Sequence, residues 1–199
     1  MKSQLLTNVS TQLKGKKISV KALSLFLIAS GGIFVNGAIF AQKQTAQAAS
    51  GVKSRTVLLD VFSAEALSKF DTGSHPDFYI QSRLDGVAKP NSPTKGNNNK
   101  PTFNYQSSQN FSADKTFVIV KVNLRDHDPV GKDERADINP SNKAKGIEMK
   151  YFPATGEIRN KADDTFLGRA NTIFTIEGDS NTSNHKARIT LRVSHLDHN

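Results

Sequence analysis

The sequence predicts an all-β domain, an antiparallel sandwich of two sheets with about eight strands, preceded by an N-terminal signal or anchor helix. Short runs of alternating apolar and polar residues predict the strands, and Gly, Pro, Asn and Asp clusters between them predict the turns. Alternation with a period of two buries one face of a strand, and many short strands at this spacing are typical of a sandwich. A basic and then apolar N-terminus predicts the leader.

Residues 1–48 have the pattern of a secretion signal of bacterial type. Lysines but no acidic residues precede the apolar run 22–41, and Ala46-Gln47-Ala48 fits a cleavage site before Ala49. We therefore expect a domain of residues 49–199 and a secreted or periplasmic product. The alternative is an uncleaved leader that anchors the domain, because the apolar run reaches the roughly 18 residues of a membrane span.

The charge of the chain is concentrated in the leader. The 199 residues include 27 Lys and Arg and 18 Asp and Glu, for a net charge of +9. Six of the lysines lie in residues 1–48, so residues 49–199 carry 21 cations against 18 anions, or +3. A nucleic-acid-binding domain needs a basic patch of its own, so we expect no nucleic-acid partner. Cysteine is absent, so the domain must depend on its apolar core.

The expected strands follow one another along residues 49–199. Alternation is clearest at Ile147, Met149 and Tyr151, which are separated by charged residues. The expected strands are 54–62, 78–84, 102–105, 116–124, 147–151, 172–176 and 186–193. One short helix is expected at 64–70, and a polar loop at 91–101.

Acidic residues gather in two connections between the expected strands. They are Asp71 and Asp77 in the first, and Asp126, Asp128, Asp133, Glu134 and Asp137 in the second. Loops at one end of a sandwich meet in space, and Ca²⁺ takes six to eight oxygen ligands, mostly carboxylates and carbonyls. The two connections together predict a calcium site. The alternative is that these residues form turns, because Asp and Asn side chains bond to the local backbone.

The same segments resemble C2 domains over most of residues 54–193. Asp71 is followed six positions later by Asp77-Phe78-Tyr79-Ile80, and Asp126-His127-Asp128 follows a long apolar strand. The run 133–140 is similar to an acidic loop of exported bacterial C2-like domains. The resemblance implies calcium ligands among Asp71, Asp77, Asp126, Asp128 and Asp133, with Glu134 and Asp137 as further candidates. The order Ser74-His75-Pro76-Asp77 departs from the usual Ser-Asp-Pro-Tyr of the family.

These observations predict an exported, non-enzymatic, C2-like module that binds Ca²⁺ at one end and mediates an envelope or surface interaction. The partner classes we expect are anionic lipid, polysaccharide or an envelope protein. One alternative is a metal-free adhesion module, and another is a small exported hydrolase that uses the carboxylates. No nucleophile-elbow, zinc-protease or phosphate-loop motif is present in the sequence, so we do not expect an enzyme.

Overall fold

A computed structural model describes residues 10–13, 16–19, 51–70, 74–141, 144–179 and 185–199. The chain divides into two compact units, Met1–Thr45 and Ala46–Asn199. Strands β1 (Ser10–Leu13) and β2 (Lys16–Ser19) form a small antiparallel pair in the first unit. The apolar run 22–41, where we expected a signal or anchor helix, lies outside the described residues. Within the described ranges, no helix is long and apolar enough to cross a membrane.

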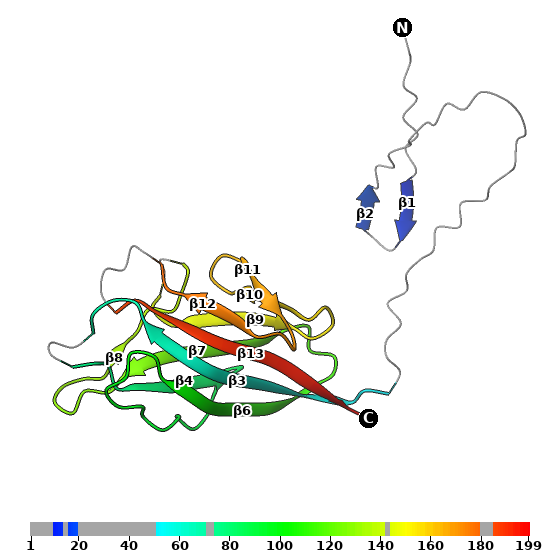
Figure 1. Ribbon diagram of the computed structural model, residues 1–199. Coiled ribbons are helices and arrows are strands. Elements are labelled where there is room, and N and C mark those ends of the chain that lie inside the picture. The colour runs from blue at the N-terminus through cyan, green and yellow to red at the C-terminus, as the bar shows by residue number, and fades with distance from the viewer. Residues whose placement is uncertain (1–9, 14–15, 20–50, 71–73, 142–143, 180–184) are drawn as a thin grey trace, which may run out of the picture. The chain divides into compact units, whose positions relative to one another are not determined.

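The second unit consists of two antiparallel sheets, which confirms the predicted all-β sandwich (Figure 1). The seven-stranded sheet has the order β11-β10-β9-β7-β4-β5, with β8 beside β7, and the four-stranded sheet has the order β12-β13-β3-β6. The strands are β3 (Ser54–Ala66), β4 (Phe78–Leu84), β5 (Val87–Ala88), β6 (Thr102–Ser112), β7 (Val118–Asp126), β8 (Glu134–Arg135), β9 (Ile147–Phe152), β10 (Glu157–Asn160), β11 (Phe166–Arg169), β12 (Phe174–Glu177) and β13 (Ala187–His198).

The core forms between the two sheets because the apolar residues of each strand alternate. In β9, Ile147, Met149 and Tyr151 are fully buried, while the intervening residues are half-exposed. In β13, Ile189 and Leu191 are buried in the same alternating manner. Burial of each such side chain stabilises the fold by roughly 1.5–3 kcal/mol.

The short helix expected at 64–70 is wrong. Residues 64–66 continue strand β3, where Ala64 pairs with Ile189 and Ala66 pairs with Ala187. A seven-residue segment gains too few internal hydrogen bonds to offset the cost of helix nucleation. Pairing with β13 therefore decides the conformation of residues 64–66.

Several strand boundaries also differ from those expected. Strand β6 extends to Ser112, although we expected it to end at Tyr105. In its second half, exposed residues alternate with the buried Ser107 and the partly buried Gln109 and Phe111, so most of that half lacks an apolar signal. Strands β10 and β11 were not predicted, because neither Glu-Ile-Arg-Asn nor Phe-Leu-Gly-Arg contains alternating apolar residues.

The longest ladder separates the two ends of the sandwich. Strands β3 and β13 pair from Ser54↔His198 to Ala66↔Ala187. Beyond the second of these ends, the connections return to one another: Leu67 N–H donates to the Lys186 carbonyl at 2.8 Å, and Asp137 N–H to the His185 carbonyl at 2.7 Å. The acidic connections therefore lie at the end of the sandwich opposite the Ser54–His198 pair.

Candidate functional site at the acidic loop end

Four carboxylates lie where strand β4 begins and strand β7 ends, and we call them the acidic loop end: Asp77, Asp126, Asp128 and Asp133. The antiparallel register sets Phe78 opposite Asp126, so the residue before β4 meets the last residue of β7. Asp126 is only 1% exposed, and its Oδ1 accepts the Asp77 N–H at 2.6 Å. The Asp77 carbonyl in turn accepts the His127 N–H at 3.0 Å. The two acidic connections thus meet in space, as the sequence predicts.

The Asp77 carboxylate turns toward a third loop. Its Oδ1 accepts the N–H of Asn97, in the polar loop that precedes β6. A Cβ atom at position 96 would lie 3.3 Å from the same oxygen, so Gly96 allows the close approach. The carboxylate therefore joins the 94–99 loop to the start of β4.

Asp133 is held by two side chains and a backbone group. The hydroxyl of Tyr79 donates to its Oδ2 at 2.6 Å, and His127 Nδ1 lies 3.0 Å from its Oδ1. The Asp128 N–H lies 3.4 Å from that same Oδ1. The hydrogen bond from Tyr79, followed by that from His127, lowers the pKa of Asp133, while burial and this bond raise the pKa of Tyr79. Asp133 is therefore an ionised acceptor at neutral pH.

Glu134 and Asp137 belong to a neighbouring group of contacts. The carboxylate of Glu134 pairs with His185 Nε2 at 2.7 Å. Asp137 is 1% exposed, and its Oδ1 accepts the N–H of Asn139 at 3.1 Å. Glu134 thus contacts the β12–β13 connection, and Asp137 contacts the backbone of its own turn.

The geometry bears directly on whether calcium fits. Across the described ranges, no group of three or more His, Cys, Asp or Glu residues is arranged to hold a metal ion. Protein N–H and O–H groups already bond to Asp77, Asp126 and Asp133. Asp71, the remaining predicted ligand, lies outside the described residues. The predicted ligand set therefore stays a prediction, and the described carboxylates alone do not complete a cage of six to eight oxygens.

Sequence reasoning missed the residues that hold these carboxylates. Tyr79 and Arg125 are cross-strand partners, and the Arg125 guanidinium donates to the Asp133 carbonyl at 2.8 Å. Each of these side chains lies on the outer face of its strand, and no local pattern in the sequence marks it as a partner of Asp133. Only the register, however, shows that they meet Asp133.

No protein-family model and no curated protein matches the sequence. Among solved structures, the chain is similar to the first C2 domain of plant extended synaptotagmin 1, with 14% identity over 75% of this chain and 98% of that chain, at a TM-score of 0.49. It is also similar to the calcium-bound tandem C2 domains of extended synaptotagmin 2, with 15% identity over 74% of this chain and 47% of that chain, at 0.47.

A third similar structure is human GIVD cytosolic phospholipase A2 in complex with methyl gamma-linolenyl fluorophosphonate. The identity is 10% over 74% of this chain, the TM-score is 0.48, and the chain spans only 18% of that enzyme's length. The first two structures are C2 domains. The likenesses concern the fold alone, and the antiparallel sandwich is established by this chain's own two sheets.

Proposed function

We propose that this protein is an exported, non-enzymatic binding module of C2-like build whose acidic loop end binds Ca²⁺. The observation that carries the proposal is the hydrogen bond between Asp77 N–H and Asp126 Oδ1. It joins the two acidic connections at one end of the sandwich, where several carboxylates share a small region. Like charges held close together favour a bound cation.

The carboxylates of Asp77, Asp126, Asp128 and Asp133 would hold the ion, together with Asp71. Carboxylate oxygens are the ligands that calcium prefers, and extracellular calcium modules bind with a Kd on the order of 10⁻⁴–10⁻³ M. An exported protein meets free calcium at such concentrations. Binding to the folded state alone would stabilise the fold by mass action.

A second candidate function is a metal-free adhesion module, and the contacts of Asp133 favour it. Tyr79 already hydrogen-bonds to its Oδ2, and His127 to its Oδ1. In this candidate the acidic residues fix the loops, and the loop surfaces bind the partner directly. Thermal melting with and without calcium distinguishes the two candidates.

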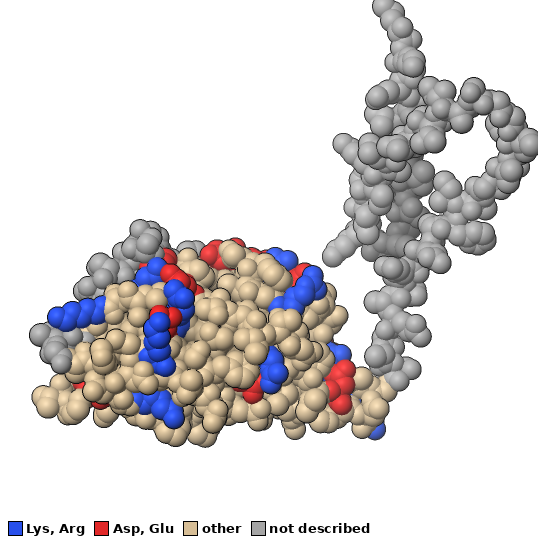
Figure 2. All heavy atoms as spheres, viewed as in Figure 1, with Lys and Arg blue, Asp and Glu red and all other residues tan. Residues whose placement is uncertain are grey.

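The hydrogen bonds of Asp133 do not suit it to the role of a general acid. A hydrolase that works by general acid catalysis needs one carboxyl with a raised pKa, whereas hydrogen bonds lower the pKa of Asp133. Basic and acidic side chains lie beside one another on the face shown in Figure 2. The partner classes remain anionic lipid, polysaccharide and envelope protein.

Thermal melting of the full chain in millimolar calcium, and then in excess chelator, tests the proposal. At about 10 mM, roughly ten times a Kd of about 1 mM, calcium adds about 1.4 kcal/mol, which raises the Tm of a domain of this size by a few degrees. The shift should disappear in Asp128→Asn and in Asp71→Asn. Asp163→Asn, which changes an exposed aspartate of the β10–β11 turn, is the control and should keep the shift. No shift at millimolar calcium would favour the metal-free module.

A further inference from the structure

Strand β6 is a long free edge of the four-stranded sheet. The sheet has the order β12-β13-β3-β6, so β6 pairs with β3 on one side only. It has 11 residues, and none of them is charged or a proline. Its ladder with β3 is regular from Ser54↔Ser112 to Val61↔Tyr105, and Figure 1 shows the strand along one margin of the sandwich. An edge with these properties is a template for another strand.

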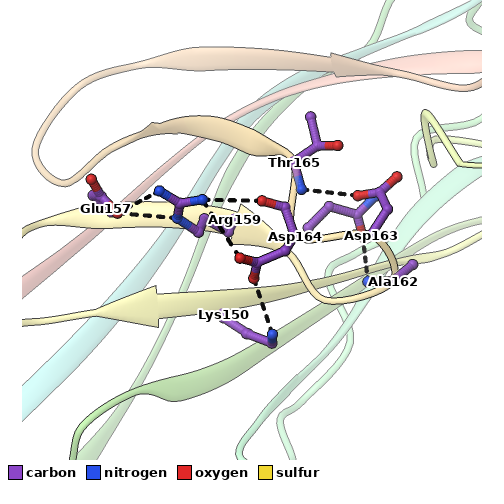
Figure 3. A network of polar contacts seen from close by, with 8 residues as sticks. Lys150, Glu157, Arg159, Ala162, Asp163, Asp164 and Thr165 are labelled. Atoms are coloured by element: carbon purple, nitrogen blue, oxygen red, sulfur yellow. Dashed lines mark hydrogen bonds and ion pairs between the residues drawn. The ribbon is translucent and has the colours of Figure 1, made fainter. Parts of the chain in front are cut away.

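The other three edge strands of the two large sheets are protected. Strand β5 has two residues, and β11 and β12 have four each. Charges also lie beside β11: Figure 3 shows Arg159 of β10 between Glu157 and Asp164, with Lys150 also turned to Asp164. The ion pairs measure 3.0 Å from Arg159 to Glu157 and 3.1 Å from Lys150 to Asp164. Short strands and charged side chains keep an edge from pairing, and β6 has neither device.

Half of the backbone groups of β6 point away from β3. In an antiparallel ladder, alternate residues direct both N–H and C=O to the partner strand, and the residues between them direct both groups outward. Among the described residues, no group outside β3 hydrogen-bonds to the backbone of residues 103–111. Donors and acceptors in this regular row are matched by another extended backbone. The edge therefore selects a polypeptide strand.

The segment 89–95 closes the edge of the opposite sheet and leaves a cavity beside β6. Three of its N–H groups donate to carbonyls of β4 at 2.7–3.0 Å. The Tyr105 hydroxyl donates to the Pro90 carbonyl at 3.0 Å, which holds the segment near β6. The cavity between them measures about 550 Å³, and its walls include the buried Phe103 and Tyr105. A strand added to β6 turns alternate side chains to this side, so apolar residues at alternate positions suit it.

The charges beside β6 oppose pairing with a second copy of the chain. Residues 86–112 include three lysines and no acidic residue. Lys89 donates to the uncharged side chain of Gln109 at 2.8 Å, and the exposed Lys95 lies in the wall of the cavity. Two copies joined symmetrically through β6 would bring their 89–95 segments together, and like charges repel. A segment with acidic ends meets no such repulsion.

We propose that β6 is a docking edge for an extended segment of another protein, which adds to the four-stranded sheet as a fifth strand. The segment alternates apolar residues, which cover the cavity, with polar residues, which face solvent. The backbone pairing provides the affinity, and the lysines favour a segment with acidic ends over one with basic ends. The docking edge uses no metal and none of the predicted calcium ligands, so it stands independently of calcium binding.

Hydrogen exchange of the ¹⁵N-labelled full chain in chelator tests the free edge. We expect alternate amides of residues 105–112 to exchange at least about tenfold faster than their neighbours, because they face away from β3. The probe is a capped peptide of about eight residues in which valine alternates with threonine and glutamate stands at each end. It should bind with a Kd on the order of 0.1 mM and protect the fast amides. Slow exchange of all these amides before the peptide is added, or binding that leaves the fast amides unprotected, would overturn the proposal.

Methylated peptides separate backbone pairing from side-chain contact. One isomer carries N-methyl groups on the even positions and the other on the odd positions, so one isomer loses the donors that face β6 and the other keeps them. We expect their affinities to differ at least about tenfold, and equal affinities would overturn the pairing. Protection of the fast amides that rises with protein concentration in the absence of peptide, together with a dimer in sedimentation, would identify a second copy as the occupant and overturn the proposed partner.

Variants of the chain complete the test. Ser108→Pro or Gln109→Pro, whichever position has the fast amide, removes an outward donor and keeps the ladder with β3. It should weaken peptide binding at least about tenfold with little change in Tm. Lys95→Gln should weaken binding of the acidic peptide about twofold to fivefold, whereas Lys132→Gln, at an exposed lysine of the β7–β8 connection, is the matched control and should leave it unchanged. Full affinity in the proline variant would overturn the docking edge, and an equal loss in both lysine variants would overturn the role of Lys95.

Discussion

The Asp126 carboxylate accepts the backbone N–H of Asp77 at 2.6 Å, and Asp126 is almost completely buried. A single side chain at the end of β7 thus fixes the start of β4. Because the acceptor is buried, its contribution does not depend on a bound ion. The relationship gives Asp126 a structural role beside any role as a ligand.

The first prediction concerns this hydrogen bond. Asp126→Ala removes the acceptor and should lower the free energy of unfolding by about 1–3 kcal/mol. Asp126→Asn keeps a side-chain oxygen and should lower the free energy of unfolding by less than Asp126→Ala does. Urea denaturation in chelator measures both changes, and Asp128→Ala should shift stability by about 0.5 kcal/mol or less. Equal stability of wild type and Asp126→Ala would contradict this role.

The second prediction concerns the pH dependence of the Tyr79–Asp133 bond. Because the pKa of Asp133 is lowered in the folded state, its stabilising contribution is present above the unfolded pKa, near 4, and is lost as the pH falls through the folded pKa. Tyr79→Phe should therefore destabilise the protein at pH 7, and the difference from wild type should shrink in acid. Denaturation at a series of pH values measures it.

Tyr105→Phe provides the control for that measurement. The Tyr105 hydroxyl contacts Ser82 Oγ at 2.7 Å and donates to the Pro90 carbonyl at 3.0 Å. Neither partner titrates, so the penalty of this variant should stay constant over the acid range. A penalty for Tyr79→Phe that is equally constant would show that Asp133 keeps its ordinary pKa.

The third prediction concerns Tyr151, which is fully buried in β9 and contacts His195 Nδ1. Burial raises the pKa of Tyr151 to about 12. The chain has three tyrosines and no tryptophan, and the pKa of Tyr79 is also raised, so the phenolate absorbance should rise late, and Tyr151→Phe should remove the step near pH 12. Because the folded pKa lies above the unfolded value, stability should be lost as the pH rises from about 10 through 12.

The fourth prediction concerns Gly178. A Cβ atom there would lie 2.3 Å from the Asp137 carbonyl oxygen, which accepts the Ala187 N–H at 2.8 Å. Gly178→Ala should destabilise the protein by about 1–3 kcal/mol, because this paired backbone cannot move without loss. Gly86→Asn is the control: no atom lies within 4 Å of its Cβ position, and Asn tolerates positive φ. Equal melting temperatures of wild type and Gly178→Ala would refute the predicted clash.

The fifth prediction concerns the leader. Cleavage after Ala46-Gln47-Ala48 should give a mature protein that begins at Ala49. Mass spectrometry of protein recovered from the producing cells and their medium measures this. A membrane-bound product that retains residues 1–48 would establish the anchor alternative instead.

How much the sequence predicts depends on how local each signal is. Alternation at Ile147, Met149 and Tyr151 predicts β9 because the pattern lies within one strand. The polar half of β6 carries no such signal, since pairing with β3 rather than a buried face defines it. The segment 64–66 has helical residues, but the partner strand β13 overrides them.

The candidate site shows the same limit. The sequence predicts that the acidic connections meet, and the contact between Asp77 and Asp126 confirms that part. Which way each carboxylate turns depends on cross-strand register, which sets Tyr79 and Arg125 side by side. Those two residues decide the environment of Asp133, and no local pattern in the sequence points to them.

The pairing of Ser54 with His198 at one end of the β3–β13 ladder has a mechanical consequence. A force that pulls the two chain ends apart opens this ladder one hydrogen-bonded pair after another, so little force is needed. A force between the start of β3 and a partner held at the acidic loop end acts along the thirteen residues of β3, roughly 40 Å. That load falls on all the cross-strand hydrogen bonds of β3 together. The domain therefore resists tension best when a partner is bound at the acidic loop end.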